Sequence, residues 1–201
     1  MFTPTEEQLR EIFKKKGYVF FDKGDFNINF FAVREDNIFD NYFSDTLIQS
    51  YYVDKKFEQV VIPGTTNAGL WGGRAVMNPR PGGVAIVKPG QYRNVWKFID
   101  SYEGWLNYPY FQQVGKFTIW RDDNKDTIID QTNEQVAINT GINCHRMSRI
   151  NENGLTVNNW SEACIGAIEP EYKKLLEPTR ESVKRYGLLF SFTLLMRSDF
   201  D

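Results

Sequence analysis

The chain has 201 residues, 41% of them hydrophobic, which is enough to bury one substantial core but short for two. Its 24 Lys and Arg residues nearly balance its 26 Asp and Glu residues, and a formal charge of -2 argues against nucleic acid as a partner. Aromatic residues, at 15%, favour pleated surfaces. We therefore expect a single domain over residues 1–201, mainly β (α+β) in class.

Residues 1–17 are predicted to form an N-terminal helix. Thr3 supplies a capping hydroxyl, Pro4 suits the first helical position, and Glu6 completes a capping box. Gly17 supplies the stop. The apolar stripe of this helix consists of Leu9, Ile12 and Phe13.

Short apolar or alternating runs separated by turn residues predict strands through most of the chain. These runs are residues 18–21, 26–33, 57–62, 84–87, 92–99, 117–120, 127–130 and 188–196, with 117–120 and 127–130 as the arms of a hairpin. Residues 37–52 are ambiguous and could hold a short helix, and 63–83 read as a long irregular loop. Residues 170–186 predict a helix, interrupted by Pro178, before the last strand.

The chain contains one histidine and two cysteines, and strand geometry distinguishes between the cysteines. If residues 141–146 form a strand, Cys144 and Arg146 face one side, while Asn143 and His145 face the other. Cys144 is then expected in the core.

Cys164 lies 19 residues after His145, in a polar stretch typical of a turn. A cysteine nucleophile reacts as its thiolate, and a nearby imidazole can take the thiol proton and later protonate the leaving group. We therefore predict a catalytic pair of Cys164 and His145. Taken separately, each residue is better explained by a buried structural role, and a Cys144–Cys164 disulfide is a further alternative.

His145 together with Ser161-Glu162-Ala163-Cys164 resembles the signature of the L,D-transpeptidase catalytic domain family. In that family a strand histidine precedes, by a loop of comparable length, a Ser-x-Gly-Cys motif that bears the nucleophile. Fainter similarity to phage-type and gut-bacterial members lies at residues 63–66, 88–92 and 121–122. The resemblance implies an L,D-transpeptidase-like β-sandwich over residues 27–201.

The resemblance also implies a cysteine enzyme that acts on the peptide stems of peptidoglycan through an acyl-enzyme. Cys164 would attack the peptide carbonyl, and His145 would serve as base and then as acid. Ser161 would give a supporting hydrogen bond, and backbone N–H groups around Ala163 and Cys164 would hold the oxyanion. The candidates for contact with the substrate are Asn143 and Arg146. Whether water or an amine accepts the acyl group separates a murein peptidase from a transpeptidase.

Several positions depart from the family pattern. Ala163 stands where the family usually has glycine, Ile165 and Gly166 replace a polar residue, and Glu162 adds a carboxylate beside the cysteine. These differences keep open a second hypothesis, a catalytically degenerate wall-binding or phage structural module of the same fold. A third hypothesis is a cysteine peptidase or amidase with a protein substrate.

No cofactor or metal is expected. One run has the alternating oxygen ligands of a calcium loop, but Thr127 replaces the turn glycine and Asn133 the bidentate glutamate, so a solvated hairpin tip is preferred. The run consists of Asp122, Asn124, Asp126 and Asp130. A single histidine with two cysteines has no recognisable zinc spacing.

The first residues carry charges throughout and lack an apolar stretch suited to a signal peptide or a membrane span. We therefore expect synthesis in the cytoplasm without a signal peptide, and no membrane partner. Action at the cell wall would then require delivery through phage lysis or a virion, or a non-classical exit route.

Overall fold

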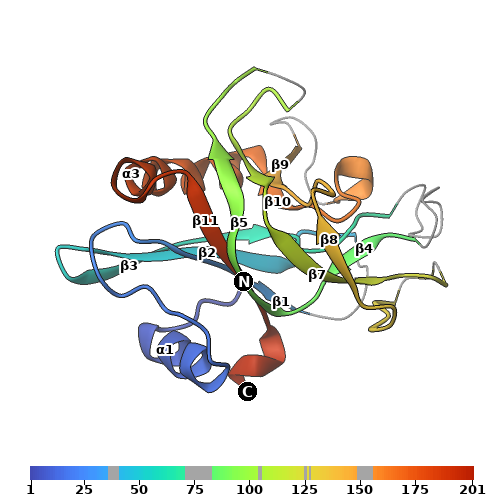
Figure 1. Cartoon of the computed structure of the whole chain (residues 1–201), viewed down its shortest axis with the longest axis horizontal. Helices are drawn as coiled ribbons and strands as arrows, with labels where there is room; N and C mark the ends of the chain where they lie inside the picture. The colour runs from blue at the N-terminus through green and yellow to red at the C-terminus, as the bar shows by residue number, and fades with distance from the viewer. Residues whose placement is uncertain (36–40, 71–82, 104–105, 125, 127, 149–155) are drawn as a thin grey trace.

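The computed structural model describes the chain except residues 36–40, 71–82, 104–105, 125, 127 and 149–155 (Figure 1). It is mainly β with helices, so the predicted α+β class is confirmed. The strands are β1 (Asn29–Arg34), β2 (Asp45–Val53), β3 (Lys56–Gly64), β4 (Ala85–Val87), β5 (Gly90–Ile99), β6 (Tyr110–Gln113), β7 (Lys116–Arg121), β8 (Gln135–Ile138), β9 (Cys144–Ser148), β10 (Ile165–Ile168) and β11 (Leu189–Met196). The α-helices are α1 (Glu6–Lys15), α2 (Glu169–Tyr172) and α3 (Leu176–Tyr186), and short 3-10 helices are η2 (Asn158–Trp160), η3 (Lys173–Leu175) and η4 (Arg197–Phe200).

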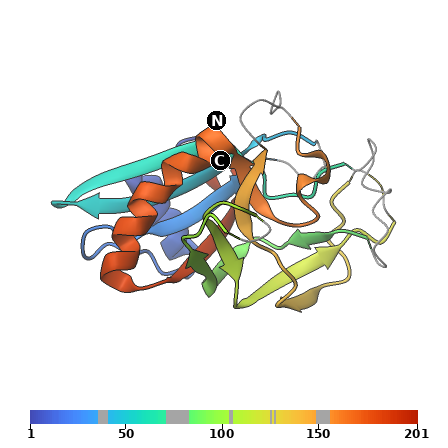
Figure 2. The same ribbon diagram turned by 90° about the horizontal axis from the view of Figure 1, so that it is seen from above.

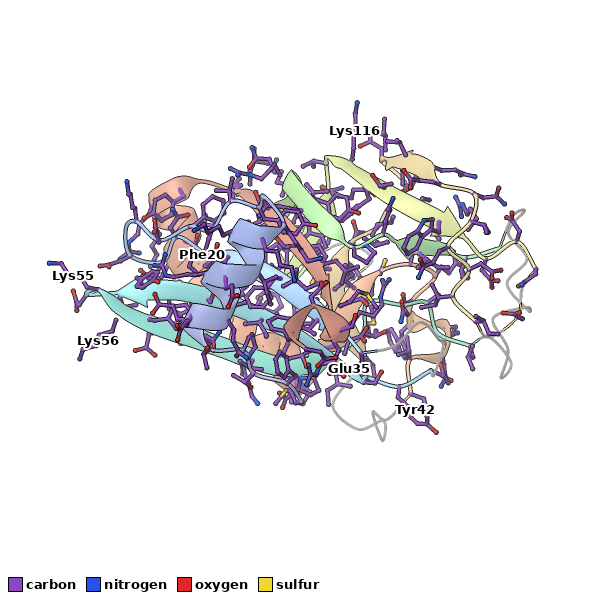
Figure 3. All side chains as sticks on the ribbon, turned by 90° about the horizontal axis from the view of Figure 1, so that it is seen from below. Phe20, Glu35, Tyr42, Lys55, Lys56 and Lys116 are labelled. Atoms are coloured by element: carbon purple, nitrogen blue, oxygen red, sulfur yellow. The ribbon has the colours of Figure 1, made fainter. Side chains whose placement is uncertain are left out.

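The strands form two sheets. The larger has eight strands in the order β10-β9-β6-β5-β11-β1-β2-β3, and the smaller has the order β4-β7-β8. Figure 2 shows the β2–β3 hairpin extending from one side of the molecule and the smaller sheet on the other. Figure 3 labels Lys55 and Lys56 at the hairpin tip and Lys116 at the start of β7.

The larger sheet curls until its two edges meet. Thr65, directly after β3, donates its N–H to the Gly166 carbonyl of β10 at 2.8 Å, and the Gly166 N–H returns a bond of 3.0 Å. A Cβ atom at Gly166 would lie 1.9 Å from the His145 carbonyl oxygen, so only glycine fits here. This seam, which we define as Thr65 and Gly166, fixes β10 between β9 and the end of β3.

The core lies inside the curl and is rich in aromatic rings. Phe30 and Phe192 pack against Trp96, with ring centroids 5.5 and 4.6 Å apart respectively. β1 is buried on both faces because its alternate residues, Phe31 and Val33, turn outward beneath α1. Burial on both faces explains why residues 30–33 of this strand are all apolar.

The N-terminal helix forms, but it begins later than predicted. Thr5 is the N-cap, and its capping box is closed by Gln8, so the assignment of Thr3 and Glu6 to these roles is wrong. Both threonines are followed three residues later by a suitable Glu or Gln, and the sequence alone does not separate the two registers. The predicted stripe of Leu9, Ile12 and Phe13 is confirmed as buried. Figure 3 shows Phe20 beside this helix, where its ring lies 5.3 Å from that of Phe13.

The strand predicted at residues 18–21 does not form. Two side-chain amides form the backbone hydrogen bonds of this segment instead. Gln91 hydrogen-bonds to the N–H and the carbonyl of Val19, and Asn29 to those of Phe21. Each amide offers a donor and an acceptor, as a neighbouring strand would. Strands do form at 57–62, 84–87, 92–99 and 188–196 and over part of 26–33, as predicted.

The other ambiguous stretches are also resolved. Residues 45–52 belong to strand β2, and 36–40 lie outside the described residues. The predicted partner of β7 at residues 127–130 is wrong, because β7 pairs with β4 and with β8. The described part of the predicted loop 63–83 has no helix after β3 ends at Gly64, and most of it, 71–82, lies outside the described residues.

The C-terminal helix is divided as Pro178 predicts, although the break precedes the proline. Pro178 occupies the first turn of α3, where its missing N–H is tolerated, and the chain before it tightens into η3. Tyr172, Leu175 and Leu176 from this region pack into the main core. None of the helices in the described part of the chain has the length and apolar character needed to cross a membrane.

A buried polar cluster joins the two sheets to the seam. Asp45 accepts bonds of 2.7 and 2.6 Å from the backbone N–H and hydroxyl of Thr66. Arg34, fully buried, donates to the Thr66 hydroxyl at 2.8 Å and to the Val87 carbonyl of β4 at 2.9 Å. Thr66 directly follows the seam residue Thr65, so these side chains fix the backbone that closes the larger sheet.

The close backbone contact at the seam predicts that adding one methyl group at Gly166 strongly lowers stability. Gly166→Ala is expected to lower the free energy of unfolding by about 3 kcal/mol or more, because the clash is with backbone and cannot be relieved by a rotamer change. Gly90→Ala, also in a strand but with only ordinary contacts of 3.5 Å or more, is the matched control and should change stability by less than about 1 kcal/mol. Urea unfolding of both variants measures this, and equal stability of the two would contradict the seam.

Candidate active site

Cys164 and His145 line the same cavity, which has a volume of about 340 Å³. Its walls come from three places in the fold. One wall is the β4–β7 pair with Ala85 and Arg121, the second is the segment 140–145, and the third is the turn 159–164. Residues distant in sequence therefore share one concave site.

Cys164 sits at the end of a turn between η2 and β10, and backbone contacts hold this turn. The Ser161 hydroxyl donates to the Cys164 carbonyl at 2.8 Å, and the Gly69 N–H donates to the Ser161 carbonyl at 3.0 Å. Gly69 lies so close to the turn that a Cβ there would be 1.8 Å from the Asn158 carbonyl oxygen. Ser161 is buried, and it is bonded to the cysteine's own backbone.

His145 is presented to the cavity by β9 and is only 3% exposed. Its Nδ1 lies 2.6 Å from the carbonyl oxygen of Arg146. Because a carbonyl can only accept, Nδ1 carries the proton and Nε2 holds the lone pair of the neutral ring. Burial lowers the pKa of His145; the backbone bond to Arg146 raises it by less, and the positive charge of Arg146 lowers it slightly. The ring is therefore a neutral base near pH 7.

The Cys164 sulfur donates a hydrogen bond of 3.2 Å to the Gly141 carbonyl oxygen. A thiolate has no proton to donate, so this geometry belongs to the thiol. In this arrangement the thiol and the neutral imidazole are both uncharged. A nucleophilic role for Cys164 would require loss of its proton before or during attack.

Cys144 faces the core, as strand alternation predicts. It is fully buried, and burial raises the pKa of its thiol well above the usual value, with a smaller contribution from Cys164. The Tyr172 hydroxyl binds the Cys144 carbonyl at 3.0 Å, which fixes the strand here. Neither cysteine forms a disulfide in the structure, so the alternative of a Cys144–Cys164 disulfide finds no support.

The other predicted site residues are distributed unevenly. Asn143 and Ala163 line the cavity, and Ala163 is not among the described residues with positive φ, so alanine causes no backbone strain there. The Arg146 side chain differs from the prediction of substrate contact. It pairs with Glu169, stacks 4.7 Å from the Tyr108 ring centroid and does not line the cavity. Arg146 serves the site through its carbonyl, because its side chain leaves the opposite face of β9 from His145.

Gln113 supports the cavity and was not predicted from the sequence. Its side-chain oxygen accepts from the Ile142 N–H at 2.9 Å and from the Thr140 hydroxyl at 3.1 Å, on either side of Gly141. Its backbone N–H donates to the Asn143 side chain at 2.9 Å. These bonds hold the carbonyl that receives the Cys164 thiol. Because the partners are far from Gln113 in sequence, no local motif could have revealed it.

Metal ligands are not assembled in the described part of the chain, where no three His, Cys, Asp or Glu side chains come together. In the run that resembles a calcium loop, Asn124 and Asp126 instead accept bonds from the backbone of Asp126 and Ile128 at 3.0 and 2.6 Å. These side chains form local turns. Lys125 and Thr127 lie outside the described residues.

Comparisons of the chain with models of protein families, with curated proteins and with solved structures each found no match. Function is therefore inferred from the site itself.

The buried histidine predicts a pH-dependent stability. Below about pH 6.5 the unfolded chain protonates its histidine, whereas the folded chain, whose His145 pKa is lower, does not. The stability that comes from keeping His145 neutral is therefore fully present above the pKa of histidine in the unfolded chain. It is lost as the pH falls toward the lower pKa of His145 in the folded chain. Between pH 7.5 and 5.5, the free energy of unfolding of the wild-type chain should fall by up to about 1.4 kcal/mol more than that of His145→Gln. Urea unfolding at both pH values measures the difference. An identical pH dependence of the two proteins would contradict a lowered pKa.

Proposed function

We propose that the chain is a cysteine-dependent acyl-transfer enzyme that acts on peptide stems of peptidoglycan, with an L,D-transpeptidase-like β-sandwich as its fold. The observation that carries the proposal is the shared cavity. In it, the Cys164 thiol is held by the Gly141 carbonyl, and His145 is held in the tautomer whose Nε2 can accept a proton. The substrate class rests on the motif of Ser161 to Cys164 with His145.

In the proposed reaction, the S–H bond of Cys164 turns from Gly141 toward His145 Nε2. The sulfur attacks the peptide carbonyl as the proton moves to the imidazole, and backbone N–H groups at Ala163 and Cys164 stabilise the oxyanion. The C–N bond then breaks, the imidazolium protonates the leaving amine, and a thioester remains on Cys164. Water or an amine then attacks the thioester as His145 takes its proton; the C–S bond breaks, and the imidazolium returns the proton to the Cys164 sulfur. The first outcome is hydrolysis and the second is transpeptidation.

Burial of His145 weakens the ring as a base toward Cys164 but favours the second proton transfer, from the imidazolium to the leaving amine. A buried imidazolium is unfavourable, so the proton taken from Cys164 is readily passed on to the leaving amine. The bond from Nδ1 to the Arg146 carbonyl keeps the ring oriented in both protonation states, because Nδ1 remains a donor throughout. No carboxylate is required for this orientation.

Two departures from the family motif have local structural explanations that are compatible with activity. Gly166 is required by the close approach of the His145 carbonyl at the seam. Ala163 occupies its turn without positive φ. A binding module without turnover is the second candidate, and the half-exposed ring of Trp160 beside the cavity favours it, since such rings commonly contact ligands.

Turnover of peptidoglycan tests the proposal. The purified chain, kept reduced, should convert peptidoglycan to new cross-linked or shortened muropeptides detectable by mass spectrometry. Cys164→Ala should abolish the products, and His145→Gln should lower the rate by about 10²–10⁴-fold, the usual contribution of a general base.

Cys144→Ala is the matched control, because it removes the other thiol and leaves the cavity unaltered; it should keep the activity if the variant remains folded. Unchanged muropeptides with the folded wild-type chain, together with retained binding to peptidoglycan, would favour the binding module. Equal products from the wild type and Cys164→Ala would exclude Cys164 as the nucleophile.

A further inference from the structure

Arg121 places a positive charge on the β4–β7 wall of the cavity that Cys164 also lines. It ends β7, pairs in register with Ala85 of β4, and lines the cavity together with Ala85 and Cys164. Of the described residues that line the cavity, Arg121 is the one Lys or Arg and Glu162 the one acid. The site therefore has opposite charges on two of its walls.

The backbone around Arg121 is built to hold its head group. One guanidinium N–H donates to the Gly83 carbonyl at 3.3 Å. Gly83 has φ +71°, and a Cβ there would lie 1.8 Å from the Asp122 carbonyl oxygen, so only glycine permits this approach. The guanidinium carries five N–H donors in a planar fork, and the Gly83 bond uses one of them.

We propose that Arg121 binds a carboxylate of the substrate, adjacent to the acyl group that Cys164 attacks. This inference rests on the proposed function and deepens it, because it defines the substrate class as peptides with a free carboxylate near the scissile bond. A guanidinium fork matches a carboxylate in shape and charge, and partial burial strengthens the pairing. The carboxylate is drawn to the β7 wall and kept from Glu162, which sets the direction in which the peptide lies.

Matched alkylating reagents test this without a natural substrate. Iodoacetate and iodoacetamide form the first pair and differ only in that one carries a carboxylate and the other an amide. The second pair is 4-maleimidobutanoate and 4-maleimidobutanamide, in which a longer chain separates the reactive group from the carboxylate or amide. For each pair, the ratio of acid to amide rate at Cys164 is measured on the full chain by peptide mass spectrometry. In Arg121→Gln the ratio should fall about five-fold for at least one pair, as expected for a partly exposed charge pair.

Arg121→Lys should retain part of the preference, because it keeps the charge and loses the fork. Arg93→Gln is the control, since it removes the same charge from an exposed position on β5, where the guanidinium lies 5.0 Å from the Phe21 ring centroid. Its ratio should be unchanged. Added salt should lower the ratio in the wild type by screening.

The outcomes separate the two proposals. Equal ratios in wild type and Arg121→Gln, with Cys164 still reacting faster than a free peptide thiol, overturn the role of Arg121 and leave the catalytic pair intact. If Arg121→Gln does not fold, a wild-type ratio that is independent of salt overturns the role equally. A Cys164 that reacts no faster than a free peptide thiol with any reagent overturns the proposed function, and this inference with it.

Discussion

The buried charges of Arg34 and Asp45 hold together the parts of the fold that meet at the nucleophile. Burial lowers the pKa of Arg34 to about 10 and raises that of Asp45, while each charge favours the charged form of the other. Both bind Thr66, whose neighbour Thr65 forms the seam with Gly166. Removing one partner of such a pair typically costs about 3–5 kcal/mol. Cys164 lies two residues before Gly166, so the position of the nucleophile depends on this cluster.

Burial also gives the two thiols and the imidazole different properties on adjacent strands. Strand alternation sends Cys144 into the core, where the pKa of its thiol is raised, and sends His145 to the cavity, where burial favours the neutral base. Cys164, half-buried directly before β10, keeps access to the cavity. In the pairing of β9 with β10, Cys144 lies opposite Ile165, and Cys164 is one residue earlier. This shift of one residue separates the inert cysteine from the available one.

Local patterns were enough to predict much of the fold. Alternation and turn residues located β3, β5 and β11, and the apolar stripe located α1. The strand expected at residues 18–21 failed because distant amides of Asn29 and Gln91 replace a strand partner. The assembly of the cavity wall through Gln113 and the placement of Arg121 depend on pairing between strands far apart in sequence, which no local pattern encodes. The opposite directions of Arg146 and His145, in contrast, follow from alternation within one strand.

The rate of alkylation of Cys164 by iodoacetamide, followed from pH 5 to 9 alongside Cys144, tests most directly whether Cys164 and His145 act as a unit. At pH 7 Cys164 should react faster than Cys144 and faster than a free peptide thiol, whose pKa is about 8.5. In His145→Gln the advantage over a free peptide thiol should disappear, because no base is left to take the thiol proton, whereas the difference from the buried Cys144 should remain. Equally slow labelling of both cysteines, or a Cys164 rate that His145→Gln leaves unchanged, would contradict the catalytic pair.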